Sequence, residues 1–207
     1  MKYLVGKKLA MAQVFAASGE VTPVTYVEVT PHSVLSIQTD SAGQPVVLVL
    51  SKDKTKANKP QSIAYPELKD GGTITQVPIK SGETPAVGDS WDASAFQVGD
   101  LVMAAGVSKG RGFQGVVKRH GFHGHPTTHG HKDQVRKSGS IGAGGVQRVF
   151  KGMRMAGRMG NDKVSVKNLV VMAVDVEKNL LAIKGALPGA RGGQIILTPF
   201  GGNVWLN

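Results

Sequence analysis

The central segment 106–160 limits what this chain can fold into more than any other feature of its sequence. It contains half of the 28 glycines and five of the six histidines, while its apolar residues are few and scattered. Such a segment cannot bury enough apolar surface to offset the conformational entropy lost when its backbone becomes ordered. The sequence therefore predicts one of two states: a segment that is disordered in isolation, or an extended arm that becomes ordered against a partner.

The positive charge of the chain is concentrated in the same segment. Between Val107 and Gly160 there are eleven Lys or Arg and one acid, Asp133, a net +10 out of +11 for the whole chain. The other residues carry 14 basic and 13 acidic groups. A basic block favours a polyanionic partner because its cations neutralise phosphates and release condensed counterions. Dense glycine lets the backbone approach phosphates closely, so we expect a nucleic-acid interface here.

The flanking segments, 1–105 and 161–207, have the short alternating or continuous apolar runs that predict β-strands. The expected strands are Val21–Thr30, Val34–Thr39, Pro45–Leu50, Val164–Val176, Leu180–Ile183 and Gln194–Thr198. Aromatic residues make up 5% of the chain, which predicts an aliphatic core. Because the C-terminal segment is too short to enclose a core alone, we expect both segments to form one closed or nearly closed β-barrel. The fold is therefore predicted to be mainly β, with residues 106–160 inserted as an arm.

Glycine and polar clusters mark the expected connections between these strands. Turns are predicted at Gly43, Gly71-Gly72, Gly82, Gly88-Asp89 and Gly99-Asp100, a polar loop at Lys52–Pro60, and a hairpin connection at Asp175–Asn179.

The stretch Gly110–Gly115 matches the glycine pattern of dinucleotide-binding turns and, with Val117, that of kinase loops. Those turns must open a helix, but Val116–His120 stops at Gly121 after about one and a half turns, and the acid that binds the ribose is absent. The sequence also lacks the catalytic motifs of a kinase. We therefore expect no nucleotide cofactor.

Five histidines, from His120 to His131, suggest zinc at first sight. Glycine and proline interrupt them, no carboxylate other than Asp133 is near, and the chain has no cysteine. The favoured interpretation is that they hydrogen-bond or stack on RNA, so neither a metal nor a catalytic residue is predicted. A metal-dependent enzyme and a basic DNA-binding protein remain the alternative hypotheses.

The N-terminus resembles a secretory signal loosely, because Lys7 and Lys8 precede the apolar stretch Leu9–Ala17. Gln13 interrupts that stretch, and its apolar residues are mostly alanine, so we interpret it as a first strand or turn of the domain. No apolar run approaches the length needed to span a membrane.

Several motifs resemble those of the large-subunit ribosomal protein L3 family, in its bacterial type. They are Ser108–Phe122, Thr128–Gly130, Gly139–Gly142, Arg148–Gly152, Met155–Gly157 and Met159–Asn161, together with Leu4–Lys8 at the start and Lys184–Gly189 near the end. The similarity runs from the first expected strand to the last.

This resemblance implies a cytoplasmic, non-enzymatic constituent of the ribosome that is not a homo-oligomer. A globular domain containing a β-barrel would lie on the outside of the large subunit. Its arm would enter the rRNA, with the loop Ile141–Gln147 nearest the peptidyl transferase centre, where the RNA itself performs catalysis. The implied partners are large-subunit rRNA and neighbouring large-subunit proteins, and the implied role includes early subunit assembly.

The predicted rRNA-binding residues combine this resemblance with the basic pattern. They are Lys7, Lys8, Lys109, Arg111, Phe113, Gln114, Lys118, Arg119, His120, Phe122, His129, Arg136, Ser140, Gln147, Arg148, Phe150, Lys151, Arg154 and Arg158. Three features depart from the family pattern: Ala10 replaces Gly, Ser138 replaces Pro, and the loop Ala143–Gln147 is one residue short. Some bacterial members carry a methylated glutamine in this loop, but Gln147 is out of register with it, so no modification is predicted.

Overall fold

The computed structural model describes residues 2–15, 19–41, 43–53, 57–78 and 85–200. The chain forms two compact units: unit 1 comprises Met1–Val107 and Lys163–Asn207, and unit 2 comprises Ser108–Asp162. Strands outnumber helices, and the few helices are short, so the predicted mainly β fold is confirmed.

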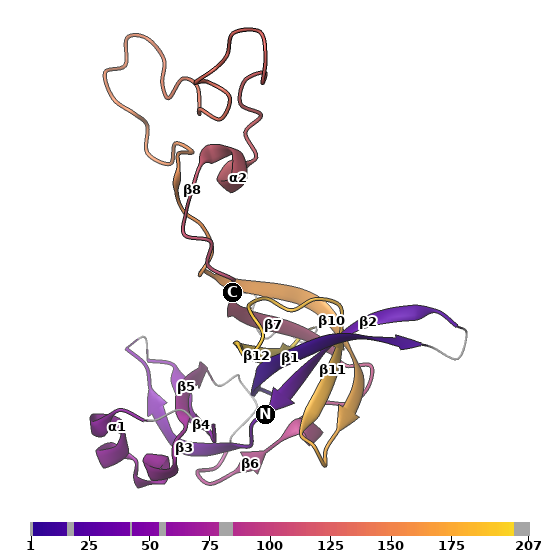
Figure 1. Ribbon diagram of the computed structural model, residues 1–207. Helices are drawn as coiled ribbons and strands as arrows, with labels where there is room; N and C mark the ends of the chain where they lie inside the picture. The colour runs from indigo at the N-terminus through magenta and orange to yellow at the C-terminus, as the bar shows by residue number, and fades with distance from the viewer. Residues whose placement is uncertain (1, 16–18, 42, 54–56, 79–84, 201–207) are drawn as a thin grey trace. The chain divides into compact units, whose positions relative to one another are not determined.

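Six antiparallel strands of unit 1 are hydrogen-bonded in a closed ring, in the order β1-β12-β7-β10-β11-β2 (Figure 1). They are β1 (Leu4–Phe15), β2 (Val21–Val29), β7 (Leu101–Val107), β10 (Lys163–Asp175), β11 (Leu180–Lys184) and β12 (Gln194–Pro199). Three strands precede unit 2 in the chain and three follow it. The prediction that the N- and C-terminal segments share one sheet is therefore confirmed.

A second antiparallel sheet lies within unit 1, in the order β5-β4-β3-β6. Its strands are β3 (His32–Thr39), β4 (Pro45–Ser51), β5 (Thr73–Pro78) and β6 (Ser90–Trp91). The expectation that all these strands join one barrel is wrong here, because β3 and β4 belong to this second sheet. Pro31 separates β2 from β3. Proline has no N–H to continue a ladder, so the chain leaves the ring at this point.

Three short helical segments were not predicted. They are α1 (Lys59–Ala64) and the 3-10 helices η1 (Pro66–Asp70) and η2 (Ala93–Ala95). Helix α1 begins inside the expected polar loop and has no buried residue, so it has no apolar stripe that could reveal it in the sequence. The expected turns at Gly43, Gly88 and Gly99 have positive φ, whereas Gly82 lies outside the described residues.

The core of unit 1 has two parts. The larger draws residues from every strand of the ring, and among its buried members only Phe96 is aromatic. The smaller joins Val5 on β1 to Val34, Val47 and Val77 of the second sheet. Since Leu4 and Val5 are neighbours on one strand, they point to opposite faces. The ring therefore has one buried cluster on each face of β1, and the prediction of an aliphatic core is confirmed.

Unit 2 contains β8 (Phe113–Gln114), α2 (Val116–His120) and β9 (Gly157–Arg158). Between α2 and β9 the chain follows an irregular path with two wide loops (Figure 1). Val116 is the one apolar side chain of Ser108–Asp162 that is buried, and every residue of this unit is described. The absence of a packed core, predicted from the sequence, is therefore confirmed. Helix α2 ends at Gly121, which has a left-handed φ of 71°.

Candidate nucleic-acid interface

The two ends of unit 2 form a short antiparallel pair. Phe113 lies opposite Arg158, and Gln114 lies opposite Gly157. The Arg111 N–H donates to the Met159 carbonyl over 2.9 Å, and the Met159 N–H donates to the Gly112 carbonyl over 3.0 Å. These bonds hold the outgoing and returning chains together with backbone groups alone, so the side chains that flank them remain available.

Glycine is required where these two chains come closest. Gly160 has a φ of 76°, and a Cβ there would collide with the Lys109 carbonyl oxygen. Only glycine combines this left-handed conformation with so close an approach.

The last two side chains of helix α2 contact the backbone just before β9. Arg119 Nη1 donates to the Met155 carbonyl over 2.7 Å, and His120 Nε2 lies 3.0 Å from the same oxygen. A Cβ on Gly157 would lie 2.7 Å from Arg119 Nη1, so this glycine makes room for the guanidinium. Both side chains were predicted to bind rRNA, and the structure gives each a partner within unit 2.

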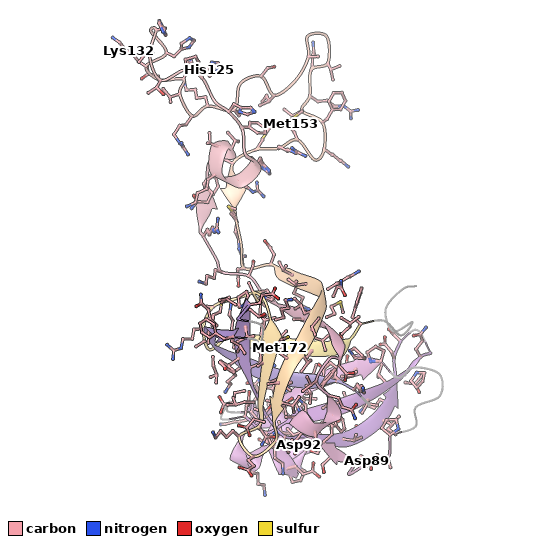
Figure 2. The ribbon with its side chains drawn as sticks, turned by 90° about the vertical axis from the view of Figure 1, so that its right-hand side faces the viewer. Asp89, Asp92, His125, Lys132, Met153 and Met172 are labelled. Atoms are coloured by element: carbon pink, nitrogen blue, oxygen red, sulfur yellow. The ribbon has the colours of Figure 1, made fainter. Side chains whose placement is uncertain are left out.

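The first loop, 122–137, is closed by a hydrogen bond of 3.1 Å from the His125 N–H to the Val135 carbonyl. Gly124, with a φ of 72°, allows this closure, since a Cβ there would collide with the Val135 carbonyl oxygen. The rings of His125 and His131 stack with centroids 5.5 Å apart and an interplanar angle of 19°. His125 and Lys132 lie in the same part of unit 2 in Figure 2. No group of three or more His, Cys, Asp or Glu that could hold a metal ion occurs among the described residues.

The second loop is exposed throughout residues 139–154. Ser140 Oγ donates to the Gly142 carbonyl over 2.7 Å and so shapes the start of the loop. The Arg148 guanidinium lies 5.9 Å from the centroid of the Phe150 ring, within the range of a cation–π contact. The guanidinium therefore lies over one face of the Phe150 ring in an exposed loop. Gln147 is exposed beside them.

Exposed cations are the main electrostatic feature of unit 2. Ten of its eleven Lys and Arg are exposed, and Arg119 is half-buried. The exposed ones are Lys109, Arg111, Lys118, Lys132, Arg136, Lys137, Arg148, Lys151, Arg154 and Arg158. With Asp133 and Asp162 as the acids, the unit has a net charge of +9, and the ion pairs found in the described part of the chain all lie in unit 1. Unpaired like charges repel one another, and an anion bound to this unit would relieve that repulsion.

The three phenylalanines of unit 2 differ in exposure. The Phe113 side chain is 77% exposed and that of Phe150 is 51% exposed. Phe122 is half-buried, with its ring 6.0 Å from that of His120. Exposed aromatic rings of this kind offer stacking surfaces for unpaired bases, so Phe113 and Phe150 fit the predicted role better than Phe122.

The remaining predicted residues are distributed between the two units. Gln114 donates to the Arg111 carbonyl within the paired chains, and His129 is exposed in the first loop with a φ of 61°. Lys7 and Lys8 belong to unit 1, where Lys8 Nζ donates to the carbonyls of Leu187 and Gly189 over 2.7 and 3.3 Å. The prediction omitted Lys132 and Lys137, which share the exposure and charge of the others; charge was their only signal, because no motif includes them.

None of the helices in the described part of the chain is long and apolar enough to cross a membrane.

Comparison with known proteins agrees with these observations. Residues 40–202 match the family described as Ribosomal protein L3. Proteins named large ribosomal subunit protein uL3 are similar over nearly their whole length. That of Herpetosiphon aurantiacus is 40% identical over 200 residues, covering 94% of each chain. That of Saccharophagus degradans is 43% identical over 202 residues, covering 95% of this chain and 94% of its own. That of Clavibacter michiganensis is 45% identical over 197 residues, covering 91% and 90%. The similarity extends along almost all of the chain, and the basic insertion without a core is consistent with it. The chain therefore belongs to the ribosomal protein L3 family.

Proposed function

We propose that this chain is a structural constituent of the large ribosomal subunit and binds large-subunit rRNA mainly through unit 2. One observation carries the proposal: ten exposed cations without ion pairs lie on a unit that buries a single apolar side chain. A unit with so small a core gains its stability from a partner, and its charge specifies a polyanion.

Different residues of unit 2 suit different parts of that task. The exposed Lys and Arg neutralise phosphates, while backbone N–H groups in glycine-rich chain approach them closely. Phe113, Phe150 and the guanidinium of Arg148 offer flat faces to unpaired bases. Arg119 and His120 act indirectly, because their bonds to the Met155 carbonyl set the shape of the loops that carry the other groups.

The finer assignment follows from the resemblance of the motifs. In this proposal the ring of unit 1 and its neighbouring sheet are a β-barrel globular domain on the outside of the subunit. Residues 106–160 are the arm, with Ile141–Gln147 nearest the peptidyl transferase centre. The protein acts early in assembly, in the cytoplasm, and contacts other large-subunit proteins. The relatives' names, which place those proteins in the large ribosomal subunit, support the part of this assignment that concerns the subunit.

Cosedimentation with the large subunit at high salt tests the proposal directly, and equilibrium binding to large-subunit rRNA fragments gives it a magnitude. Neutralising about ten phosphates predicts a log–log dependence of affinity on salt with a slope of about −7 to −9. Duplex DNA should compete poorly. A slope near zero, or equal affinity for duplex DNA, would contradict the proposal.

A matched pair of charge variants locates the interface. Four exposed cations of unit 2 are replaced by glutamine in one variant: Arg111, Lys118, Arg154 and Arg158. Four exposed lysines of unit 1 are replaced in the other: Lys52, Lys59, Lys69 and Lys178. The slope should become less steep by about 3 to 4 in the first variant and stay nearly constant in the second. Equal effects would mean that the contact is not concentrated in unit 2.

A further inference from the structure

The outer part of strand β1 has one open edge. β12 pairs with β1 only over Leu4–Lys7, and the hydrogen bonds of Lys8 with Gly192 and Gly193 are the last on that side. From Met11 to Phe15 the strand is paired with β2 alone among the described residues, and Leu9 and Ala10 lie in a bulge between the paired residues Lys8 and Met11. The hairpin of β1 and β2 accordingly extends beyond the neighbouring strands of the ring in Figure 1. A row of backbone N–H and C=O groups is thus available to another chain.

One face of this hairpin is exposed and mostly apolar, with Gln13 as its exposed polar member. Side chains alternate along a strand, so Met11 and Phe15 share a face, and Val21 joins them because it lies directly opposite Phe15. Their side chains are 52%, 68% and 46% exposed, respectively. Pro23, on the same face, is also exposed. The apolar face and the open edge therefore meet on one segment of strand.

The outer part of the hairpin lacks cations, in a chain with a net charge of +11, and its one charged residue is Glu20. No charged residue occurs from Leu9 to Gly19. Proteins usually protect an exposed edge strand with lysine, glutamate, proline or a bulge, and the stretch from Met11 to Phe15 has none of these. Neutralising phosphates requires cations, which the stretch from Leu9 to Gly19 lacks. Its chemistry suits a protein, and an uncovered edge of this composition is an aggregation hazard.

We propose that the open edge of β1 from Met11 to Phe15 receives an extended segment of another large-subunit protein as an added strand. Backbone hydrogen bonds hold that segment, and its alternate apolar side chains cover Met11, Phe15 and Val21. This inference rests on the proposed function, since it takes the partner to be a protein of the same subunit. It assigns the two parts of the chain different partners: RNA for the cationic unit 2, and protein for the outer part of the hairpin, which has no cation.

Two exposed phenylalanines provide an internally controlled test. A photoreactive benzoyl-phenylalanine is placed at Phe15 in one full-length variant and at Phe113 in another. These side chains are similarly exposed, at 68% and 77%. Large subunits carrying each variant are purified, washed at high salt and irradiated, and the products are treated with ribonuclease or protease before mass spectrometry.

Position 15 should crosslink to one large-subunit protein, giving a product that survives ribonuclease, and position 113 should crosslink to rRNA. Crosslinking from position 15 to rRNA, to a second copy of this chain, or to nothing would overturn the inference. Failure of position 113 to reach rRNA would instead count against the proposed function. The two failures are therefore distinguishable.

A second pair of variants tests the apolar face. Met11→Lys with Phe15→Lys should lower the amount of the crosslinked partner in purified subunits at least tenfold, and leave binding to rRNA fragments unchanged. The control, Val87→Lys with Val98→Lys, changes two valines that are 65% and 66% exposed outside the hairpin, and should retain the partner. Circular dichroism verifies that each variant is folded. Full retention of the partner by the hairpin variant would refute the proposed contact.

Discussion

Acid should weaken unit 1 through a single buried histidine. His32 is 1% exposed, and its Nε2 accepts a hydrogen bond of 2.8 Å from the Val5 N–H. Its ring stacks on that of Trp91, with centroids 5.9 Å apart. Because Val5 is on β1 and His32 is on β3, this bond connects the ring to the second sheet. Protonation would put a hydrogen on Nε2 that faces the Val5 N–H, so it must break the connection.

The magnitude follows from the pKa of this histidine. Burial lowers the pKa of His32 from 6.5 to about 4. The folded state thus binds fewer protons than the unfolded state. The contribution of His32 to the free energy of unfolding is fully present above pH 6.5 and is lost as the pH falls toward 4. Each pH unit within this window corresponds to about 1.4 kcal/mol, so the free energy of unfolding should fall by about 2 kcal/mol between pH 7 and pH 5.

Urea unfolding at pH 7, 6 and 5 measures this fall. Trp91 fluorescence is the probe, in a background where Trp205 is replaced by phenylalanine. The carboxyl pKa values of Asp92 and Asp100 are lowered, chiefly by hydrogen bonds to Ser94 and to the Gln97 N–H respectively, so these groups act mainly below pH 5. The variant His32→Gln keeps an acceptor for the Val5 N–H and cannot titrate. It should be less stable at pH 7 but lose the dependence between pH 7 and pH 5. A flat profile in the parent protein, or an unchanged slope in the variant, would refute the reasoning.

Three further predictions concern local geometry. Gly124→Ala should abolish the hydrogen-exchange protection of the His125 amide, because its Cβ meets the Val135 carbonyl; Gly130→Ala, with a φ of 82° and open space around it, should retain that protection. Gly6→Ala should lower the free energy of unfolding by about 1–3 kcal/mol in urea titrations, since its Cβ would lie 2.6 Å from the Glu28 carbonyl oxygen, whereas Gly115→Ala has nothing within 4 Å and should change little. Lys8→Met should lower the free energy of unfolding by about 1–2 kcal/mol and leave rRNA affinity unchanged. Lys7→Met should not lower the free energy of unfolding. If Lys8→Met instead lowers rRNA affinity without lowering stability, Lys8 belongs to the interface.

Local patterns in the sequence predicted β2, β3, β4, β10, β11 and β12, because alternation and β-branched residues depend on near neighbours. They did not predict β5, β6 or β7. They did not show which strands pair. The strands β3 and β4 look like the strands of the ring, and only the interruption at Pro31 and the packing of Val34 and Val47 against β1 separate them. Helix α1 escaped prediction for a related reason: with no buried residue, it has no periodic signal.

The exposed cations of the candidate interface could be predicted from charge alone. The basic side chains that form long-range hydrogen bonds within the protein could not. Ten cations identified in the sequence are exposed in unit 2, including two that the predicted site omitted. Arg119 and Lys8, in contrast, donate to carbonyls 36 and 179 residues away. No spacing in the sequence reports such partners, so a basic residue that stabilises the fold resembles one that binds RNA.

The pairing of the first strand with the last has a consequence for biosynthesis. Leu4 on β1 pairs with Leu197 on β12, so the ring of unit 1 cannot close until β12 has been synthesised. Synthesis proceeds at about 5–20 residues per second, so about 4–17 s separate Val107 from Gln194. Throughout that interval the newly made cationic segment has emerged, or is emerging, while its own scaffold is still open. Nascent chains therefore have time to meet rRNA before their final strand arrives, and recruitment need not wait for completed folding.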